Sequence, residues 1–157
     1  IGDFNSDPAR ASIDGSVLVV IAAALGLGQA MTDSGAAQMV ADQLMQLGGG
    51  SPLLMLALVY LTTTLFTEII TNNAAAVLMF PIAMAVSEQL GVSLMPYAIA
   101  IMFAASASFA TPIGYQTNTF VYGAGGYKFT DFIRVGLPLN IIFAVVAVIV
   151  IPLFFPF

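Results

Sequence analysis

Two short polar segments interrupt otherwise apolar stretches of this chain, at residues 67–73 and 106–114. The first reads Thr-Glu-Ile-Ile-Thr-Asn-Asn, and the second reads Ser-Ala-Ser-Phe-Ala-Thr-Pro-Ile-Gly. Inside a bilayer, an unpaired backbone polar group costs several kcal/mol unless protein or a water-filled cavity satisfies it. The chain is therefore constrained to form helices that break at these two places and that shelter the breaks against protein or water.

The composition indicates a chain that lies in a membrane. Of its 157 residues, 60% are hydrophobic and 7% are charged, and the mean hydropathy is +1.02. A soluble domain carries roughly 25% charged residues, so this chain cannot cover a water-facing surface. At about 20 residues per crossing, its length allows some five or six spans. We predict an all-α membrane protein embedded in a lipid bilayer.

Residue types argue against several classes of function. Eight acidic and three basic residues give a net charge of −5, so no basic patch can neutralise phosphates and we expect no nucleic-acid partner. The chain has no cysteine, no histidine, no Gly-x-Ser-x-Gly elbow and no phosphate-binding Gly-x-x-x-x-Gly-Lys loop. We therefore expect neither an enzyme nor a bound cofactor.

The apolar runs predict a succession of helices. Hydrophobic stretches and breaking residues place them at 13–31, 34–47, 53–70, 73–90, 97–110, 115–121, 127–134 and 135–154. Two of these segments, 34–47 and 127–134, mix apolar with polar residues and are expected to be amphipathic. Residues 1–12 are predicted to form a loop. Because the chain opens on Ile1 rather than Met, we interpret it as part of a longer protein.

At the first break, two helix ends of opposite polarity are predicted to meet. The helix before it ends with free carbonyl groups near Thr67 to Ile70, and the next begins with free N–H groups near Asn72 and Asn73. One turn of chain thus offers oxygens to a cation and N–H groups to an anion. A plain polar loop is the alternative, because each arm has about 18 residues, roughly 27 Å of helix, which is enough to cross the bilayer.

The second break combines a proline, a glycine and many uncharged polar groups. Pro112 removes a backbone donor, and Gly114 permits irregular backbone. Hydroxyl and amide groups surround them at Ser106, Ser108, Thr111, Gln116, Thr117 and Asn118. This density of neutral polar groups indicates a second binding element, with a proline kink and Ser/Thr back-bonding as the alternative.

Glu68 is the one carboxylate deep in an apolar run. An acid within a membrane segment is by default a candidate functional residue, here a proton or cation site. The alternative is an acid at a helix end that reaches water or a neighbouring backbone donor. The sequence leaves both interpretations open.

The two breaks resemble parts of the divalent anion:sodium symporter family. Residues 67–82 resemble that family's second Ser-Asn-Thr hairpin, while Phe-Ala-Thr-Pro at 109–112, the glycines of 123–126 and residues 132–137 resemble its second broken helix and closing span. The resemblance covers nearly the whole chain. It implies an ion-transporter architecture with inverted repeats, of which 13–157 is the C-terminal one, comprising a re-entrant hairpin at 53–90, a broken helix at 97–122, an interfacial helix at 127–134 and a last span at 135–154.

The same resemblance implies the residues of the site. One sodium ion would lie among the backbone oxygens of Thr67, Ile70 and Ala110 and the side chain of Asn72. The anion would face Thr71, Asn72, Asn73 and Thr111. The N-terminal half of the transporter, with its own hairpin and cation site, would be a partner, and a homodimer is implied as well.

Departures from the family pattern bear on the substrate. The family's Ser-Asn-Thr is Thr71-Asn72-Asn73 here, so a larger amide replaces the last hydroxyl. The Gly-Tyr-Gln-Thr-Asn stretch at 114–118 resembles the sulfate-permease branch rather than the dicarboxylate branch. We therefore expect sulfate as the substrate.

These features predict half of a sodium-coupled symporter that carries a divalent anion by alternating access, as a multi-pass protein of the plasma (inner) membrane. A dicarboxylate symporter, a sodium-independent anion exchanger and a proton-coupled carrier using Glu68 are rivals within the same architecture. A non-transporting membrane scaffold is a rival of another class. It predicts that Asn72 and Thr111 can be replaced without loss of function.

Overall fold

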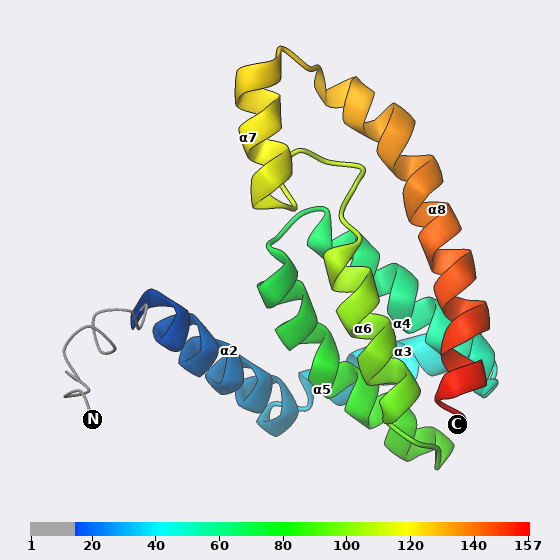
Figure 1. The fold of residues 1–157 in the computed structure, drawn as a ribbon. Helices are drawn as coiled ribbons and strands as arrows, with labels where there is room; N and C mark the ends of the chain where they lie inside the picture. The colour runs from blue at the N-terminus through cyan, green and yellow to red at the C-terminus, as the bar shows by residue number, and fades with distance from the viewer. Residues whose placement is uncertain (1–14) are drawn as a thin grey trace, which may run out of the picture.

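The computed structural model describes residues 15–157, and the predicted loop at 1–12 lies outside this range. The described residues form helices and no strand, which confirms the all-α prediction. Figure 1 shows the helices in chain order: α2 (Gly15–Asp33), α3 (Ala36–Gly48), α4 (Pro52–Thr67), α5 (Asn72–Leu90), α6 (Met95–Ser106), α7 (Gln116–Gly125) and α8 (Phe129–Phe154).

Three helices, α4, α5 and α6, pack against one another in a central bundle (Figure 1). On this bundle, α2 and α3 both contact α5, and α8 runs along α4 and α6. The start of α8 rises beyond the bundle beside α7. The break between α4 and α5 and the break between α6 and α7 therefore lie at the same end of the bundle.

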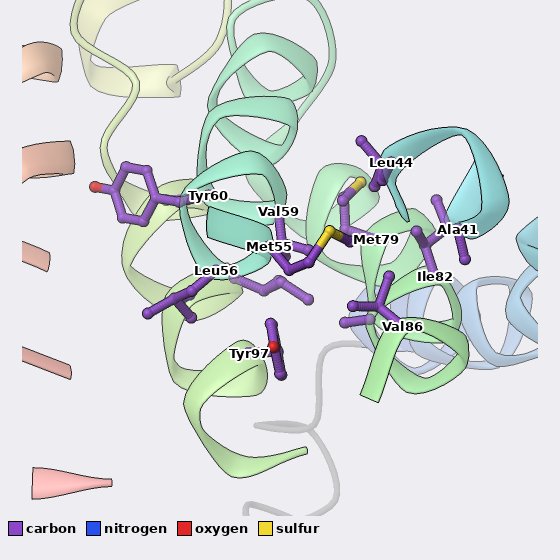
Figure 2. Packing of buried hydrophobic residues seen from close by; sticks show 14 of the residues in the cluster. Ala41, Leu44, Met55, Leu56, Val59, Tyr60, Met79, Ile82, Val86 and Tyr97 are labelled. Atoms are coloured by element: carbon purple, nitrogen blue, oxygen red, sulfur yellow. The ribbon is translucent and has the colours of Figure 1, made fainter. Parts of the chain in front are cut away.

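The core lies between α3, α4, α5 and α6. Figure 2 shows ten of its side chains with labels: Ala41, Leu44, Met55, Leu56, Val59, Tyr60, Met79, Ile82, Val86 and Tyr97. In lipid, apolar burial favours helix association little, so close packing must hold the helices together. Alanines with no exposed surface, Ala75, Ala83, Ala100 and Ala104, allow the backbones of α5 and α6 to approach their neighbours.

Local signals account for the ends of the helices around the first break. Pro52 stands in the first turn of α4, where its missing N–H costs nothing. Thr71 is the N-cap of α5, and its hydroxyl accepts a hydrogen bond from the Ala74 N–H at 3.4 Å. Only residues 68–71 separate α4 from α5. The helix–break–helix pattern predicted at 53–90 is thus present.

The second break is longer than the sequence pattern suggested. Helix α6 ends at Ser106, whereas the apolar run predicted helix to residue 110. Ala107 leaves helical geometry with φ −93° and ψ 64°. Residues beyond it direct their polar groups at α4 instead of continuing the helical ladder. Helix α7 continues to Gly125, past the predicted end at 121–122.

The predicted separate interfacial helix at 127–134 is wrong, because α8 runs without a break from Phe129 to Phe154. At its start, the Asp131 carboxylate accepts a hydrogen bond from the Lys128 N–H at 2.8 Å, which closes the first turn. Pro138 lies inside the helix and removes a single backbone donor, so α8 passes through it. Neither Arg134 nor Val135 breaks a helix, so α8 continues past the predicted boundary.

Two helices among the described residues, α5 and α8, are long and apolar enough to cross a membrane. The apolar helices α4 and α6 have 16 and 12 residues, about 24 Å and 18 Å of helix, which is less than a bilayer core of about 30 Å. Short helices that end at a break suit a hairpin and a broken helix. Because α5 is long enough to cross, the re-entrant arrangement stays a prediction.

Candidate functional site

The two polar breaks lie against each other. The Ser108 hydroxyl donates a hydrogen bond to the Thr67 carbonyl oxygen at 3.2 Å, and the Thr111 hydroxyl donates one to the Glu68 carbonyl oxygen at 2.8 Å. The last carbonyl groups of a helix have no partner within the helix. Hydroxyl groups of the second break therefore satisfy the carboxyl end of α4.

Thr67 anchors this junction. Its side chain has no exposed surface, and its hydroxyl donates a hydrogen bond to the Ala105 carbonyl oxygen at 2.9 Å, near the end of α6. Its own carbonyl oxygen accepts from Ser108 and, having two lone pairs, keeps one for a further partner such as a cation. Thr67 thus ties the ends of α4 and α6 together at the predicted sodium site.

Gly114 is required by the close approach of the second break to α4. A Cβ atom built on it would collide with the Thr67 carbonyl oxygen and the Ser108 hydroxyl. The Gly114 N–H donates a hydrogen bond to the Thr111 hydroxyl at 3.3 Å. The sequence predicted irregular backbone at Gly114, and the structure shows that its lack of a side chain permits this contact.

The first turns of α7 hold the second break in shape. The Asn118 amide donates hydrogen bonds to the Ser108 carbonyl oxygen at 2.9 Å and to the Thr111 carbonyl oxygen at 3.2 Å. The Thr119 hydroxyl donates one to the Pro112 carbonyl oxygen at 2.6 Å. The second break is thus a folded loop in which the carbonyl groups of Ser108, Thr111 and Pro112 accept hydrogen bonds from α7. It is not a simple kink within a continuous helix.

Glu68 spans the gap between α4, the second break and α8. Its Oε1 accepts hydrogen bonds from the Ala110 N–H at 3.0 Å and from the Asn140 amide at 2.7 Å. Of the two interpretations drawn from the sequence, a helix-end acid that reaches a neighbouring backbone donor describes these contacts. The other oxygen, Oε2, is buried and has no hydrogen-bond partner.

The amino end of α5 lies directly after the first break. Thr71 uses its side chain as the N-cap, which leaves the N–H groups of Asn72 and Asn73 at the positive end of the helix dipole. Asn72 is half-buried, and Asn73 is exposed. An anion meeting this end of α5 would find backbone donors and amide side chains.

The structure joins some predicted site residues and not others. Thr67, Ala110 and Thr111 belong to one hydrogen-bonded network through Glu68 and Ser108. Within residues 15–157, no hydrogen bond links the side chains of Asn72 or Asn73 to that network. The ligand roles given to Ile70, Asn72 and the other predicted residues stay predictions.

The oxygen atoms at the junction suit a hard monovalent cation. They include backbone carbonyl oxygens at the end of a helix and hydroxyl oxygens of the second break, and unwound transporter helices offer such carbonyl groups to sodium. In the described part of the chain, no group of three or more His, Cys, Asp or Glu side chains gathers in one place. A cation at the junction would meet neutral oxygens and the single carboxylate of Glu68.

Two residues of the network were not identified from the sequence. Asn140 is only 7% exposed and donates to Glu68, and Gly136, one turn earlier on α8, lets that helix touch the backbone of Phe109 and Ala110. A signal was present: Asn140 is the one polar side chain between residues 135 and 154. Polar side chains in such spans usually face the protein interior.

A helical bundle in which two broken segments meet at one end is the architecture of an integral membrane transporter. The chain belongs to the citrate transporter family, whose profile matches residues 2–157. This membership agrees with the resemblance to divalent anion:sodium symporters that the two breaks indicated.

Relatives of the chain include transporters with and without a stated substrate. An uncharacterized transporter of Synechocystis sp. is 50% identical over 80% of this chain and 21% of its own length. Sodium/sulfate cotransporter 1 of Chlamydomonas reinhardtii is 38% identical over 93% of this chain and 17% of its own length. The sodium-dependent dicarboxylate transporter SdcS of Staphylococcus aureus is 27% identical over 86% of this chain and 26% of its own length. The chain thus spans about a quarter or less of the relatives' lengths.

Proposed function

We propose that this chain supplies most of the C-terminal inverted repeat of a sodium-coupled secondary transporter for a divalent anion, with sulfate as the favoured substrate. The observation that carries the proposal is the junction of the two breaks. There the carbonyl end of α4 meets the hydroxyl groups of Ser108 and Thr111, and the amino end of α5 follows within four residues. Opposite helix ends at one place offer a cation and an anion adjacent sites.

In the proposed mechanism sodium binds first. The ligands would be the backbone oxygens of Thr67, Ile70 and Ala110 and the Asn72 side chain. A cation there would order the hairpin, and its charge would favour an anion beside the amino end of α5. The anion would then meet N–H groups, amides and hydroxyls without a fixed cationic residue.

The placement of the basic residues supports an anion site without a cationic side chain. Within residues 15–157 these are Lys128 and Arg134, both exposed at the start of α8. Neither takes part in the network around Glu68. Within this part of the protein, attraction for a divalent anion would come from helix ends and from bound sodium, which would make transport depend on sodium.

The remaining parts of the proposal concern the whole protein. The N-terminal half would supply a second hairpin and cation site, and transport would proceed by alternating access with the binding half moving against a scaffold. A homodimer in the plasma (inner) membrane, with several spans per protomer, completes it.

Sulfate is preferred over dicarboxylates for two reasons. The 114–118 stretch resembles the sulfate branch, and several relatives named sodium/sulfate cotransporters are 37–40% identical to this chain. A dicarboxylate substrate is the second candidate, because SdcS, at 27% identity, is named for dicarboxylates.

Uptake of radiolabelled sulfate into proteoliposomes holding the full-length transporter tests the proposal. Uptake that needs an inward sodium gradient and that excess succinate does not reduce would support both the coupling and the substrate. Uptake blocked by succinate would move the substrate to dicarboxylates. Uptake indifferent to sodium would overturn the coupling and favour an exchanger or a proton-coupled carrier, and no uptake at all would favour a scaffold.

A further inference from the structure

We infer that Glu68 and Asn140 are positioning residues that set the geometry of the proposed cation site by holding the Ala110 segment between α4 and α8. The inference rests on the proposed function, because it concerns the same sodium site. It gives α8 a role in the cation site, whereas the sequence predicted only the last membrane span there. It also assigns Glu68 a role that does not require its charge.

Glu68 accepts hydrogen bonds from Ala110 and from the next residue, Thr111. Its side-chain Oε1 accepts from the Ala110 N–H at 3.0 Å, and its backbone carbonyl accepts from the Thr111 hydroxyl at 2.8 Å. The carbonyl group of Ala110 lies between these two anchored points. Glu68 also follows Thr67 directly, so one residue connects two of the proposed sodium ligands.

Helix α8 also contacts the segment around Ala110. A Cβ atom on Gly136 would collide with the Phe109 carbonyl and the Ala110 Cα, so the helix surface touches the backbone there. The rings of Phe109 and Phe143 lie 5.2 Å apart, which extends the contact along α8. Gly136 and Asn140, four residues apart, lie on one face of the helix. That face therefore backs the second break.

Asn140 completes the joint between α8 and α4. Its amide donates to Glu68 Oε1 at 2.7 Å, across 72 residues of sequence, and only 7% of the residue is exposed. Both Asn140 Oδ1 and Glu68 Oε2 are buried acceptor atoms without a partner. An unpaired buried acceptor is costly to stability.

The Glu68→Gln variant distinguishes a positioning role of Glu68 from direct binding of the cation by its carboxylate. In Glu68→Gln the side-chain oxygen can still accept from the Ala110 N–H and the Asn140 amide. A positioning residue therefore tolerates this change. A direct ligand whose charge holds the cation does not, because the carboxylate charge is lost.

The test uses the full-length transporter in proteoliposomes, with sulfate uptake measured over a range of sodium concentrations. We expect Glu68→Ala and Asn140→Ala to raise the half-saturating sodium concentration by about 10-fold, as loss of an outer partner does at metal sites. The KM for sulfate at saturating sodium should change much less. Glu68→Gln should behave like the unsubstituted protein, and Ile141→Ala, next to Asn140 but facing outward, is the matched control.

A second readout does not depend on transport. We expect the Tm of the purified protein to be higher in sodium chloride than in choline chloride, because a ligand that binds the folded state stabilises it. Glu68→Ala and Asn140→Ala should lose most of this sodium-dependent shift, and Glu68→Gln should keep it. In the double variant Glu68→Ala/Asn140→Ala the effect should equal that of Glu68→Ala alone, since the Asn140 side chain acts through its hydrogen bond to Glu68.

Two results would overturn the inference while leaving the proposed function intact. One is an unchanged sodium dependence in Asn140→Ala. The other is a Glu68→Gln variant that loses sodium dependence as fully as Glu68→Ala, which would make the carboxylate itself a cation ligand. If the unsubstituted protein shows sulfate uptake without any sodium dependence, the proposed function fails, and the inference fails with it.

Discussion

The Ser108 hydroxyl donates its hydrogen bond to the carbonyl oxygen of Thr67, a residue 41 positions earlier in the chain, at 3.2 Å. This bond joins the two polar breaks, which the sequence shows only as separate segments. It caps a carbonyl group at the end of α4 that would otherwise lack a donor. The junction is therefore a structural unit, and its members can be tested one at a time.

Asn72→Ala should abolish sodium-coupled sulfate uptake while leaving membrane insertion intact. The change removes the amide proposed to bind sodium and to face the anion, and alanine remains a good residue for the first turn of α5. Uptake in proteoliposomes and the size-exclusion profile of the purified protein are the measurements. Sodium-dependent uptake at the unsubstituted rate would contradict the assignment of Asn72.

Asn73→Thr should shift substrate preference, because it restores the hydroxyl at the third position of the Ser-Asn-Thr pattern. The smaller side chain leaves more room beside the amino end of α5. We expect succinate to become a better competitor of sulfate uptake, and the ratio of the two inhibition curves measures this. Asn73→Gln, which keeps an amide, is the matched control. An unchanged ratio in Asn73→Thr would remove Asn73 from the anion site.

Gly114→Ala should disrupt the junction, because the added methyl group would collide with the Thr67 carbonyl oxygen and the Ser108 hydroxyl. Overpacking of this kind typically costs about 1–3 kcal/mol, so both the Tm and sulfate uptake should fall. Gly123→Ala is the matched control, since a Cβ atom there meets nothing within 4 Å. Equal behaviour of the two variants would show that the contact at Gly114 is unimportant.

Thr111→Val should weaken the junction at nearly constant shape. It removes the hydroxyl that donates to the Glu68 carbonyl oxygen at 2.8 Å and leaves that oxygen without this donor. A loss of about 1 kcal/mol in stability is expected, together with reduced affinity for the anion. Ser106→Ala is the control, because the Ser106 hydroxyl bonds within α6, to the Met102 carbonyl oxygen. Thermal unfolding and the KM for sulfate distinguish the two variants.

Thr71→Ala should destabilise the start of α5. The Thr71 hydroxyl accepts from the Ala74 N–H at 3.4 Å, and loss of an N-cap typically costs about 1 kcal/mol. Thr71→Ser keeps the oxygen and should restore both stability and uptake. If serine fails to restore uptake while stability recovers, the methyl group of Thr71 has a role that capping does not explain.

The positions of the breaks could be predicted because their signals are local. Polar residues within apolar runs, Pro52 at a helix start and Thr71 at an N-cap act on their own neighbours in the chain. Predictions from local signals were wrong where a tertiary contact competed with helix formation. The run up to residue 110 is apolar enough for helix, yet the chain leaves α6 at Ser106 and bonds to α4 instead. Likewise no local stop separates 127–134 from the last span.

Hydropathy and helix caps depend on residues a few positions apart, so the sequence alone predicts a helical chain in a membrane and the places of its two broken segments. That the breaks meet, and that α8 contacts both of them through Gly136 and Asn140, depends on how the helices pack. The Asn140–Glu68 bond spans 72 residues, and such a pairing is set by how the helices pack. No pattern within one helix specifies which distant backbone a lone asparagine or glycine will touch.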